Sequence, residues 1–319
     1  MATSLAHSSE TLRNGVNAPL CAGFHTRLRA IFRLTRTALH LANGILTAAL
    51  VYPFITQGSR RALKQRWSRQ LLSVLGVHLK ISEGIPQIVG AGGTPHSKLP
   101  WGAAHGTRNA HPTGLLVANH ISFLDIFVIN AWAPAAFVSK DDVRGWPLIG
   151  WLSQRTDTIF MQRGSRRAAQ ATRDQLVSQL RAGQLVAVFP EGTTSDGHGV
   201  QAFHSALFQS AIDASAPVMP LALRYFDAHN HQPSHAADYV GDMTLVGCLW
   251  SIASSEGLIA QLEPLPALAA TGIDRRHLAA HARHAVAHQL AQMVNPSPKV
   301  SPAAGTADEI PAGPPAAQR

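Results

Sequence analysis

Cysteine is nearly absent from this chain, which has only Cys21 and Cys248 among its 319 residues. Two cysteines provide neither a disulfide framework nor a zinc ribbon. Their scarcity is typical of a protein that works in a reducing compartment. The chain also contains no internal repeat, so its length corresponds to one catalytic domain of about 200 residues plus an N-terminal element.

Acidic residues are missing from one long stretch. Between Thr11 and Ser82 there is no Asp or Glu, while eleven Lys and Arg residues lie there. The whole chain carries a formal charge of +9, so its basicity belongs to this N-terminal segment. Such a segment suits either nucleic acid or an anionic membrane. We predict no nucleic-acid partner, because the basic residues flank a long apolar run and only Trp67 offers a stacking aromatic there.

The apolar run spans 19 residues, Thr37–Ile55, which could just cross a bilayer core of about 30 Å. A secretory signal peptide fits poorly, since the run starts late and no small-residue cleavage site follows. Apolar residues then recur at helical spacing from Leu63 to His78, with basic residues around them. This pattern indicates a helix that either contacts anionic lipid or packs on the catalytic domain.

Apolar runs of strand type alternate with helical patterns over residues 113–294, which predicts an α/β sheet with helices on its faces. We divide the chain into a flexible N-terminus (1–26), membrane-associating helices (27–83), a Gly/Pro-rich connecting loop (84–112), the catalytic domain (113–294) and a disordered Pro/Ala-rich tail (295–319). The predicted strands are Leu115–Asn119, Ala136–Ser139, Thr158–Met161, Leu185–Phe189, Val218–Leu223 and Leu258–Leu262. The predicted helices are Phe123–Trp132, Leu148–Gln154, Arg166–Arg181, Ala202–Ala214, Met243–Ser254 and His277–Val294.

The segment Asn119–Asp125 combines a histidine and a carboxylate at the end of the first of these strands. A carboxylate that holds one imidazole nitrogen fixes the tautomer and makes the other nitrogen a better base. If a helix begins near Ser122, with Ser122 as its N-cap, His120 and Asp125 can meet across the turn. Alone, this spacing is equally compatible with a loop histidine and an unrelated surface Asp.

Three further segments place polar groups at strand ends. Thr158–Arg163 is a short strand that ends in arginine, and Phe189–Gly197 concentrates hydroxyls, backbone amides and Glu191 in a turn. Pro217–Leu223 is another strand candidate and contains Pro220.

Two other kinds of chemistry can be tested against the residues. A serine hydrolase of the nucleophile-elbow type needs Gly-x-Ser-x-Gly, and the segment Gly192–Gly197 has one residue too many before its serine. The histidine stripe formed by His277, His281, His284 and His288 has no nearby Cys pair or Glu. We therefore predict no metal site and interpret the stripe as an ordinary helix face.

Together the four segments resemble the ordered motifs of the glycerolipid acyltransferase family, which includes the bacterial 1-acylglycerol-3-phosphate acyltransferases. The resemblance runs from about Leu115 to Pro266 and implies a mixed sheet flanked by helices, as in glycerol-3-phosphate acyltransferases. It also implies that His120 is the general base for direct transfer of an acyl group and that Asp125 orients it. In the same way it assigns acceptor binding to the following residues: Asn119, Arg163, Glu191, Gly192, Thr193 and Pro220.

This sequence departs from the family pattern at two positions that concern the choice of acceptor. Many phosphatidate-forming relatives have an arginine where this chain has Thr194 and a lysine at the position of His204. The segments 195–208 and 239–243 look more like the branch of lyso-ornithine lipid acyltransferases. We expect 1-acyl-sn-glycerol-3-phosphate as acceptor, with lyso-ornithine lipid as the alternative. A non-catalytic membrane lipid-binding protein is a more remote one.

The expected partners are membrane lipids, the lyso-lipid acceptor and a thioester donor, either acyl-CoA or acyl carrier protein. No cofactor is expected. The resemblance and the basic N-terminal segment together place the protein at a bacterial inner membrane. We expect the catalytic domain on the cytoplasmic face, with the membrane element either single-pass or interfacial.

Overall fold

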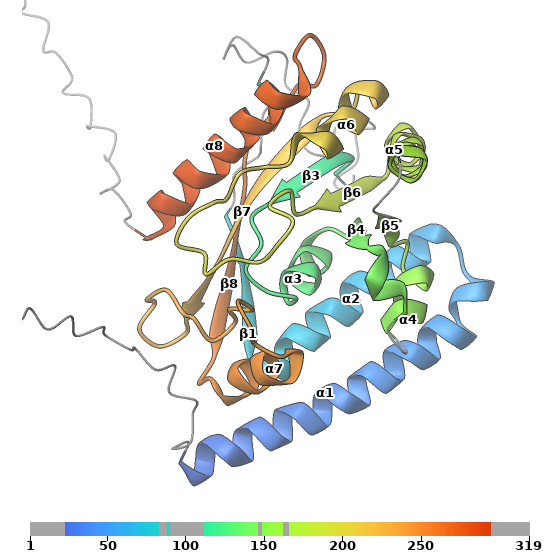
Figure 1. The fold of residues 1–319 in the computed structure, drawn as a ribbon. Coiled ribbons are helices and arrows are strands. Elements are labelled where there is room, and N and C mark those ends of the chain that lie inside the picture. Colours follow the sequence, from blue (N-terminus) through green and yellow to red (C-terminus); the bar gives the residue numbers. More distant parts are fainter. Residues whose placement is uncertain (1–22, 83–87, 90–111, 146–148, 162–165, 295–319) are drawn as a thin grey trace, which may run out of the picture.

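A computed structural model describes residues 23–82, 88–89, 112–145, 149–161 and 166–294 (Figure 1). Arg163, the tail 295–319 and most of the segments 1–26 and 84–112 lie outside these residues. The first described helix already begins at Phe24, so the last residues of the predicted flexible N-terminus are helical.

The core of the described structure is a nine-stranded mixed sheet, as the sequence predicts. Its main path has the order β1-β8-β7-β3-β6-β4-β5, and β9 joins the edge of β7 and pairs with β2. Within it β8 and β9 run antiparallel to β7, and the other neighbours are parallel. The strands are β1 (Val77–Ile81), β2 (Ile88–Val89), β3 (Gly114–Ala118), β4 (Ala136–Lys140), β5 (Ile159–Met161), β6 (Leu185–Val188), β7 (Val218–Asp227), β8 (Leu258–Pro264) and β9 (Ala267–Leu268).

Helices cover both faces of this sheet (Figure 1). On one face α2 (Gln57–Leu75), α3 (Asp125–Trp132) and α7 (Leu245–Ser254) share a buried cluster with the strands. On the other face α5 (Arg166–Arg181), α6 (Phe208–Ala214) and α8 (Arg275–Val294) do the same. The remaining described helices are α1 (Phe24–Leu50), α4 (Ile149–Arg155) and the 3-10 turns η1 (Tyr52–Phe54), η3 (Asp141–Gly145) and η4 (Ser205–Leu207). Because both faces are covered, β3 and β6 are buried along their whole length.

The predicted amphipathic helix corresponds to α2, and the structure shows what its apolar face contacts. Thr56 caps its start by accepting a hydrogen bond from the Ser59 backbone N–H at 3.3 Å. It ends at Gly76, whose φ of 76° favours glycine, and a Cβ there would clash with the Arg33 guanidinium. Leu71, Leu72 and Leu75 are buried in the cluster with α3. The apolar face of α2 is therefore packed on the catalytic domain, and His78, predicted at its end, lies in β1.

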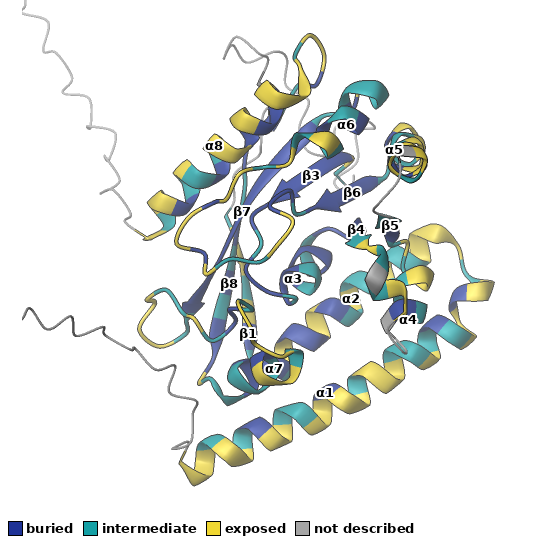
Figure 2. Cartoon of the chain, viewed as in Figure 1, coloured by how far each residue is buried: buried dark blue, intermediate teal, exposed yellow. Residues whose placement is uncertain are grey.

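The segment around the long apolar run forms α1, which starts well before Thr37 and ends at Leu50. Pro53 in the following turn η1 explains the end, since proline cannot continue the backbone bonding of a helix. α1 lies outside α2 and α7 and is mostly exposed or half-buried along its length (Figure 2). The continuous segment Phe24–Phe54 is long and apolar enough to cross a membrane by length and composition.

Parallel pairing brings the carboxyl ends of three predicted strands to one edge of the sheet. β3, β6 and β5 all run the same way, so their carboxyl ends lie along that edge. β7 is parallel to β3 but longer than predicted. Ala118 at the end of β3 pairs with Leu221, so residues 222–227 run on beside the first motif.

Candidate active site

His120 and Asp125 meet directly. The Nδ1 atom of His120 lies 2.8 Å from Oδ2 of Asp125, and Asp125 is fully buried. The same Oδ2 accepts hydrogen bonds from the backbone N–H groups of Ile121 at 2.7 Å and Ser122 at 3.0 Å. Three donors thus converge on this one carboxylate oxygen. The predicted contact of base and acid is therefore present in the structure.

The local turn differs from the prediction at Ser122. α3 begins at Asp125 rather than near Ser122, and no side chain caps it. The Ser122 hydroxyl is instead buried 3.9 Å from the Cys248 sulfur, and the Ser122 backbone N–H donates to Asp125. The prediction of Ser122 as N-cap is thus wrong, because Asp125 closes the turn with its own side chain. This tight turn brings Nδ1 of His120 to the carboxylate without an intervening turn of helix.

The other imidazole nitrogen of His120 is available. No hydrogen bond to Nε2 comes from the described residues, and the His120 side chain is 19% exposed. One face of the imidazole ring stacks on Phe189, with 3.9 Å between ring centroids and 8° between planes. Phe189 is the first residue of the third motif. Nothing in the sequence indicates that its ring would stack on the imidazole of His120.

Glu191 holds the backbone of the site. One carboxylate oxygen accepts from the His120 backbone N–H and the other from the Gln201 backbone N–H, both at 2.9 Å. Burial raises the pKa of Glu191, and the two backbone hydrogen bonds oppose that shift. The side chain is 4% exposed and both oxygens are engaged. The contact of Glu191 with the acceptor stays a prediction, and in the structure its carboxylate ties the third motif to the first.

Asn119 also bonds to the protein itself. Its amide donates to the Leu223 carbonyl and accepts from the Leu223 backbone N–H, both at 2.9 Å, and the residue is fully buried. The amide thereby continues the pairing of β3 with β7 one step beyond the strand. Its role in acceptor binding stays a prediction, and in the structure its amide holds the residue before His120 against β7.

The remaining predicted residues lie in different environments. Gly192 and Thr193 are exposed, and a Cβ added at Gly192 would come within 3.4 Å of the His204 ring. His204 therefore stands directly beside the third motif. Pro220 is buried in β7 opposite Val117, so it belongs to the sheet rather than to an open surface. Thr194 donates its hydroxyl hydrogen bond to the Tyr239 carbonyl, which fastens the third motif to the segment 228–243.

Two residues that the sequence analysis missed come from the extension of β7. Tyr225 is 1% exposed, and its hydroxyl lies 2.7 Å from Oδ1 of Asp125. Arg224 is also buried and donates to the Gly197 carbonyl in the third motif. Strand alternation could have placed Tyr225 on the buried face of Leu221 and Leu223, but the predicted strand ended at Leu223.

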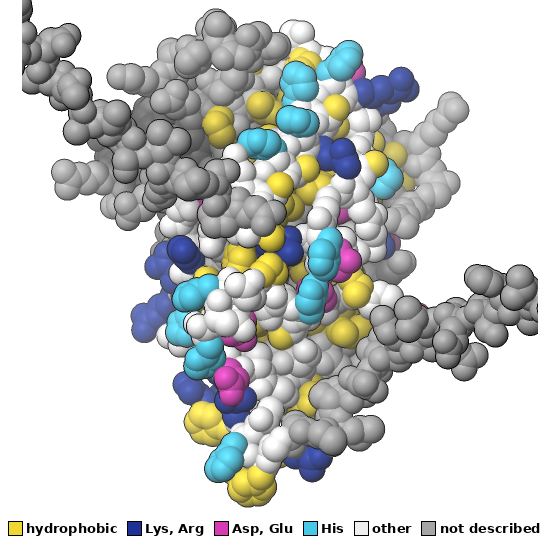
Figure 3. All heavy atoms as spheres, turned by 90° about the vertical axis from the view of Figure 1, so that its left-hand side faces the viewer, with side chains coloured by type: hydrophobic (Ala, Val, Ile, Leu, Met, Phe, Trp, Pro, Cys, Tyr) yellow, Lys and Arg dark blue, Asp and Glu magenta, His cyan; other side chains and the backbone are white. Residues whose placement is uncertain are grey.

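A covalent nucleophile and a metal centre find no support in the described part of the chain. Burial raises the pKa of the Cys248 thiol to about 11, so it stays protonated, and Ser122 is fully buried. Within the described ranges no three His, Cys, Asp or Glu side chains could hold a metal ion, and Figure 3 shows histidines spread over one face. The four histidines of the stripe on α8 are all exposed, as expected for an ordinary helix face.

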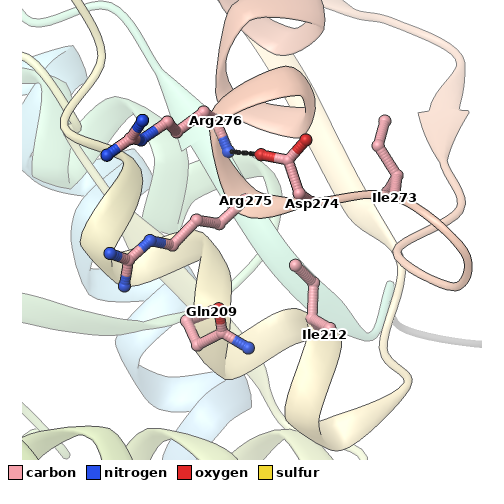
Figure 4. A pocket seen from close by; sticks show the side chains of 6 residues that line it. All are labelled: Gln209, Ile212, Ile273, Asp274, Arg275 and Arg276. Carbon is pink, nitrogen blue, oxygen red and sulfur yellow. Dashed lines mark hydrogen bonds between the residues drawn. The ribbon is translucent and has the colours of Figure 1, made fainter.

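One hollow of the described structure lies away from the four motifs. It has a volume of about 380 Å³ between α6 and the start of α8, where the Asp274 carboxylate accepts a hydrogen bond from the Arg276 backbone N–H (Figure 4). None of its lining residues belongs to the four motifs.

The fold and the site thus define a protein with a histidine held by a buried aspartate at the edge of an α/β sheet. The acyltransferase family model matches residues 103–224. A lyso-ornithine lipid O-acyltransferase from Pseudomonas aeruginosa is 32% identical over 227 residues, which cover 71% of this chain and 78% of that protein. On these grounds the chain belongs to the glycerolipid acyltransferase family, as its motifs suggested.

Other relatives differ in their named acceptor. A 1-acyl-sn-glycerol-3-phosphate acyltransferase from Neisseria gonorrhoeae is 42% identical over 157 residues, 48% of this chain and 60% of that protein. The matched region thus spans about three fifths of the length of that relative. The crystal structure of a 1-acyl-sn-glycerophosphate acyltransferase from Thermotoga maritima has the same fold, with a TM-score of 0.56 at 16% identity. The superposition covers 84% of this chain and 96% of that one.

Proposed function

We propose that the protein is an O-acyltransferase that moves a fatty acyl group from a thioester to the free hydroxyl of a membrane lyso-lipid. The observation that carries this proposal is the geometry of His120, whose Nδ1 is fixed on Asp125 while Nε2 is free to receive a proton. In the reaction Nε2 takes the proton of the acceptor hydroxyl as its oxygen attacks the thioester carbonyl. The new ester bond forms, the C–S bond breaks, and the proton passes on to the leaving thiolate.

The acceptor that we favour is 1-acyl-sn-glycerol-3-phosphate, which would give phosphatidate for phospholipid synthesis. The 42% identity to the Neisseria protein supports it. We propose that Arg163 binds the phosphate, since a guanidinium can donate two parallel hydrogen bonds to such a group. The exposed Gly192 and Thr193 of the third motif would also contact the acceptor.

Lyso-ornithine lipid is the second candidate, and two residues favour it. Thr194 and His204 stand where phosphate-binding relatives carry fixed positive charges. Thr194 bonds to the Tyr239 carbonyl, and His204 adjoins Gly192, so neither position supplies a permanent cation. The similarity to the Pseudomonas protein over most of both chains supports the same acceptor. A lipid-binding protein without catalysis is disfavoured, because binding alone would not require His120 and Asp125 in contact.

We further propose that the protein works at the cytoplasmic face of a bacterial inner membrane, with acyl-CoA or acyl carrier protein as donor. Large apolar side chains of α1, including Phe24, Phe32, Leu39 and Leu46, are exposed. Arg29 and Arg33 bind α1 to the backbone carbonyls at the end of α7. A helix fastened along the catalytic domain in this way supports interfacial insertion rather than a span.

His120→Ala tests the reaction. The purified variant should lose acyl transfer by about 10² to 10⁴, the usual contribution of a general base, because the proposed proton acceptor is removed. The readout is release of free thiol from acyl-CoA and from acyl carrier protein, with lysophosphatidate and lyso-ornithine lipid tested in parallel. His281→Ala, on the exposed face of α8, serves as the matched control and should keep wild-type activity.

The acceptor panel separates the candidates. Turnover of lysophosphatidate alone supports the first acceptor, and turnover of lyso-ornithine lipid alone supports the second. Activity of folded His120→Ala within a few-fold of wild type would refute the mechanism. A wild-type protein that binds both lipids and releases no thiol would instead support the lipid-binding alternative.

A further inference from the structure

Tyr225 is a buried polar residue that the proposed reaction does not use. It lies on β7, one hundred positions after Asp125, and its hydroxyl is 2.7 Å from Oδ1 of Asp125. Leu221 and Leu223 precede it on the same face of the strand and simply pack in the core. Tyr225 is therefore the one position of this face in β7 where a hydroxyl replaces an aliphatic side chain, and that hydroxyl meets the acid of the active site.

The two oxygens of Asp125 are bound in different ways. Oδ2 receives three donors, from Nδ1 of His120 and from the backbone N–H groups of Ile121 and Ser122. From the described residues, Oδ1 receives only the Tyr225 hydroxyl. Burial, followed by the charge of Asp125, raises the pKa of Tyr225 well above its ordinary value. The phenol therefore stays protonated and acts as the donor in this contact.

We propose that Tyr225 is a positioning residue that fixes the plane of the Asp125 carboxylate and shares its charge, and thereby sets the orientation and basicity of His120. The inference rests on the acyl transfer proposed above. Three donors on Oδ2 alone leave the carboxylate free to tilt about its Cβ–Cγ bond. A fourth donor on Oδ1 holds the other end of the group, so the carboxylate faces the imidazole in one orientation.

Loss of the Tyr225 hydroxyl should shift the pH dependence in one direction, which a change in packing alone would not do. A hydroxyl donating to Oδ1 draws negative charge away from the oxygen that faces His120. Without it the carboxylate stabilises the imidazolium more strongly, so the base becomes protonated at a higher pH. The other ionisable groups near the pair are Glu191 from the third motif, Cys248 from α7 and Asp238 from the segment 228–243. A Tyr225 substitution leaves all three side chains in place.

Tyr225→Phe removes one oxygen atom and keeps the ring. We expect kcat to fall roughly ten-fold, as for the loss of a partner that orients a histidine, with KM for the acceptor within about two-fold of wild type. The acidic limb of the kcat/KM profile should move to higher pH by roughly 0.4 to 1 unit, the equivalent of one hydrogen bond. In an Asp125→Asn background the same substitution should change kcat by less than about two-fold, because the charged acceptor is gone.

Tyr52→Phe is the matched control. Tyr52 is also buried, and its hydroxyl donates to the Arg60 carbonyl at 3.4 Å, away from the four motifs. It should leave the pH profile unchanged. Site-specific 3-fluorotyrosine at position 225 covers the case in which Tyr225→Phe does not fold. Its more acidic phenol should strengthen the bond and move the acidic limb to lower pH.

Unchanged kcat and an unmoved acidic limb in both Tyr225 substitutions would overturn the proposal, whatever happens to the melting temperature. An equal loss of kcat in the wild-type and Asp125→Asn backgrounds would also overturn it. The proposed reaction fails separately, since it is judged by His120→Ala with Tyr225 intact.

Discussion

At the scale of single residues, two buried polar side chains near His120 bond to the backbone of the protein itself. Asn119 bonds to the backbone of β7, and Glu191 bonds to the backbone of His120 and Gln201. Both side chains are buried, so a change at either one is felt through the position of His120. A residue of a motif can therefore have one of two roles. It contacts the acceptor, or it holds the residue that reacts.

Glu191→Gln distinguishes these two roles. Glutamine has one acceptor oxygen, so one of the two backbone N–H groups would lose its partner, at a cost of about 1 to 3 kcal/mol. We expect a lower melting temperature and a lower kcat, with KM for the acceptor nearly unchanged. Thermal denaturation and steady-state kinetics on the same preparation measure both. A raised KM with an unchanged melting temperature would show that Glu191 contacts the acceptor instead.

At the scale of elements, α2 is the link between the basic segment and the catalytic domain. Lys64 on this helix donates to the Ala135 carbonyl at 2.9 Å and to the Thr156 carbonyl at 3.2 Å. Gln65 and Arg69 bond to the backbone carbonyls of Trp132 and Ala131, at the end of α3. The basic residues of α2 thus satisfy carbonyls of the catalytic domain, and part of the charge first assigned to lipid serves the fold.

Lys64 should make stability depend on pH. Burial lowers the pKa of Lys64 to about 8, whereas in the unfolded chain it returns to about 10.5. Between these values the unfolded state binds more protons, so the free energy of unfolding should rise with pH, by about 1 to 3 kcal/mol in total. In Lys64→Met this rise should be absent. Urea denaturation between pH 7.5 and 10.5 measures it, with Lys80→Met, at an exposed position of β1, as control. Equal pH slopes in wild type and Lys64→Met would contradict the prediction.

At the scale of the whole molecule, the sheet edge with His120 and the exposed side of α1 belong to one body. α7 joins them, since Cys248 packs under Ser122 while the end of the same helix is bound by Arg29 and Arg33. The proposed contact of α1 with lipid would set the height of the active site above the membrane, which would suit an insoluble acceptor. The basic residues of the segment add attraction to anionic head groups.

The double variant Leu39→Glu/Leu46→Glu tests this contact. Both leucines are exposed on α1, so the fold should be retained while binding to vesicles with anionic lipid falls on the order of ten-fold per leucine. Vesicle co-sedimentation measures binding, and turnover of a short-chain soluble acceptor should stay near wild type. Ala280→Glu/His284→Glu on the exposed face of α8 is the matched control. Vesicle binding equal to wild type in the α1 variant would argue against α1 as the membrane contact.

Local sequence patterns were sufficient to predict much of this structure. Each of the six predicted strands is present, because apolar runs bounded by turn residues are encoded within five to ten residues of chain. The predicted catalytic pair was also confirmed in contact, since His120 and Asp125 are close in sequence and share one turn. The starts of helices were predicted less accurately. At Ser122 the turn is closed by the side chain of Asp125, five residues after His120.

The sequence by itself determined the α/β class, the order of the motifs and the contact of His120 with Asp125. Only the tertiary structure decided what Asn119, Glu191 and Tyr225 bond to, and whether the apolar side of α2 meets protein or lipid. The reason is physical: a period in the sequence shows which face of an element is apolar, whereas the partner of that face comes from an element up to a hundred residues away. Tyr225 and Asp125 meet only because β7 pairs beside β3 and extends beyond it.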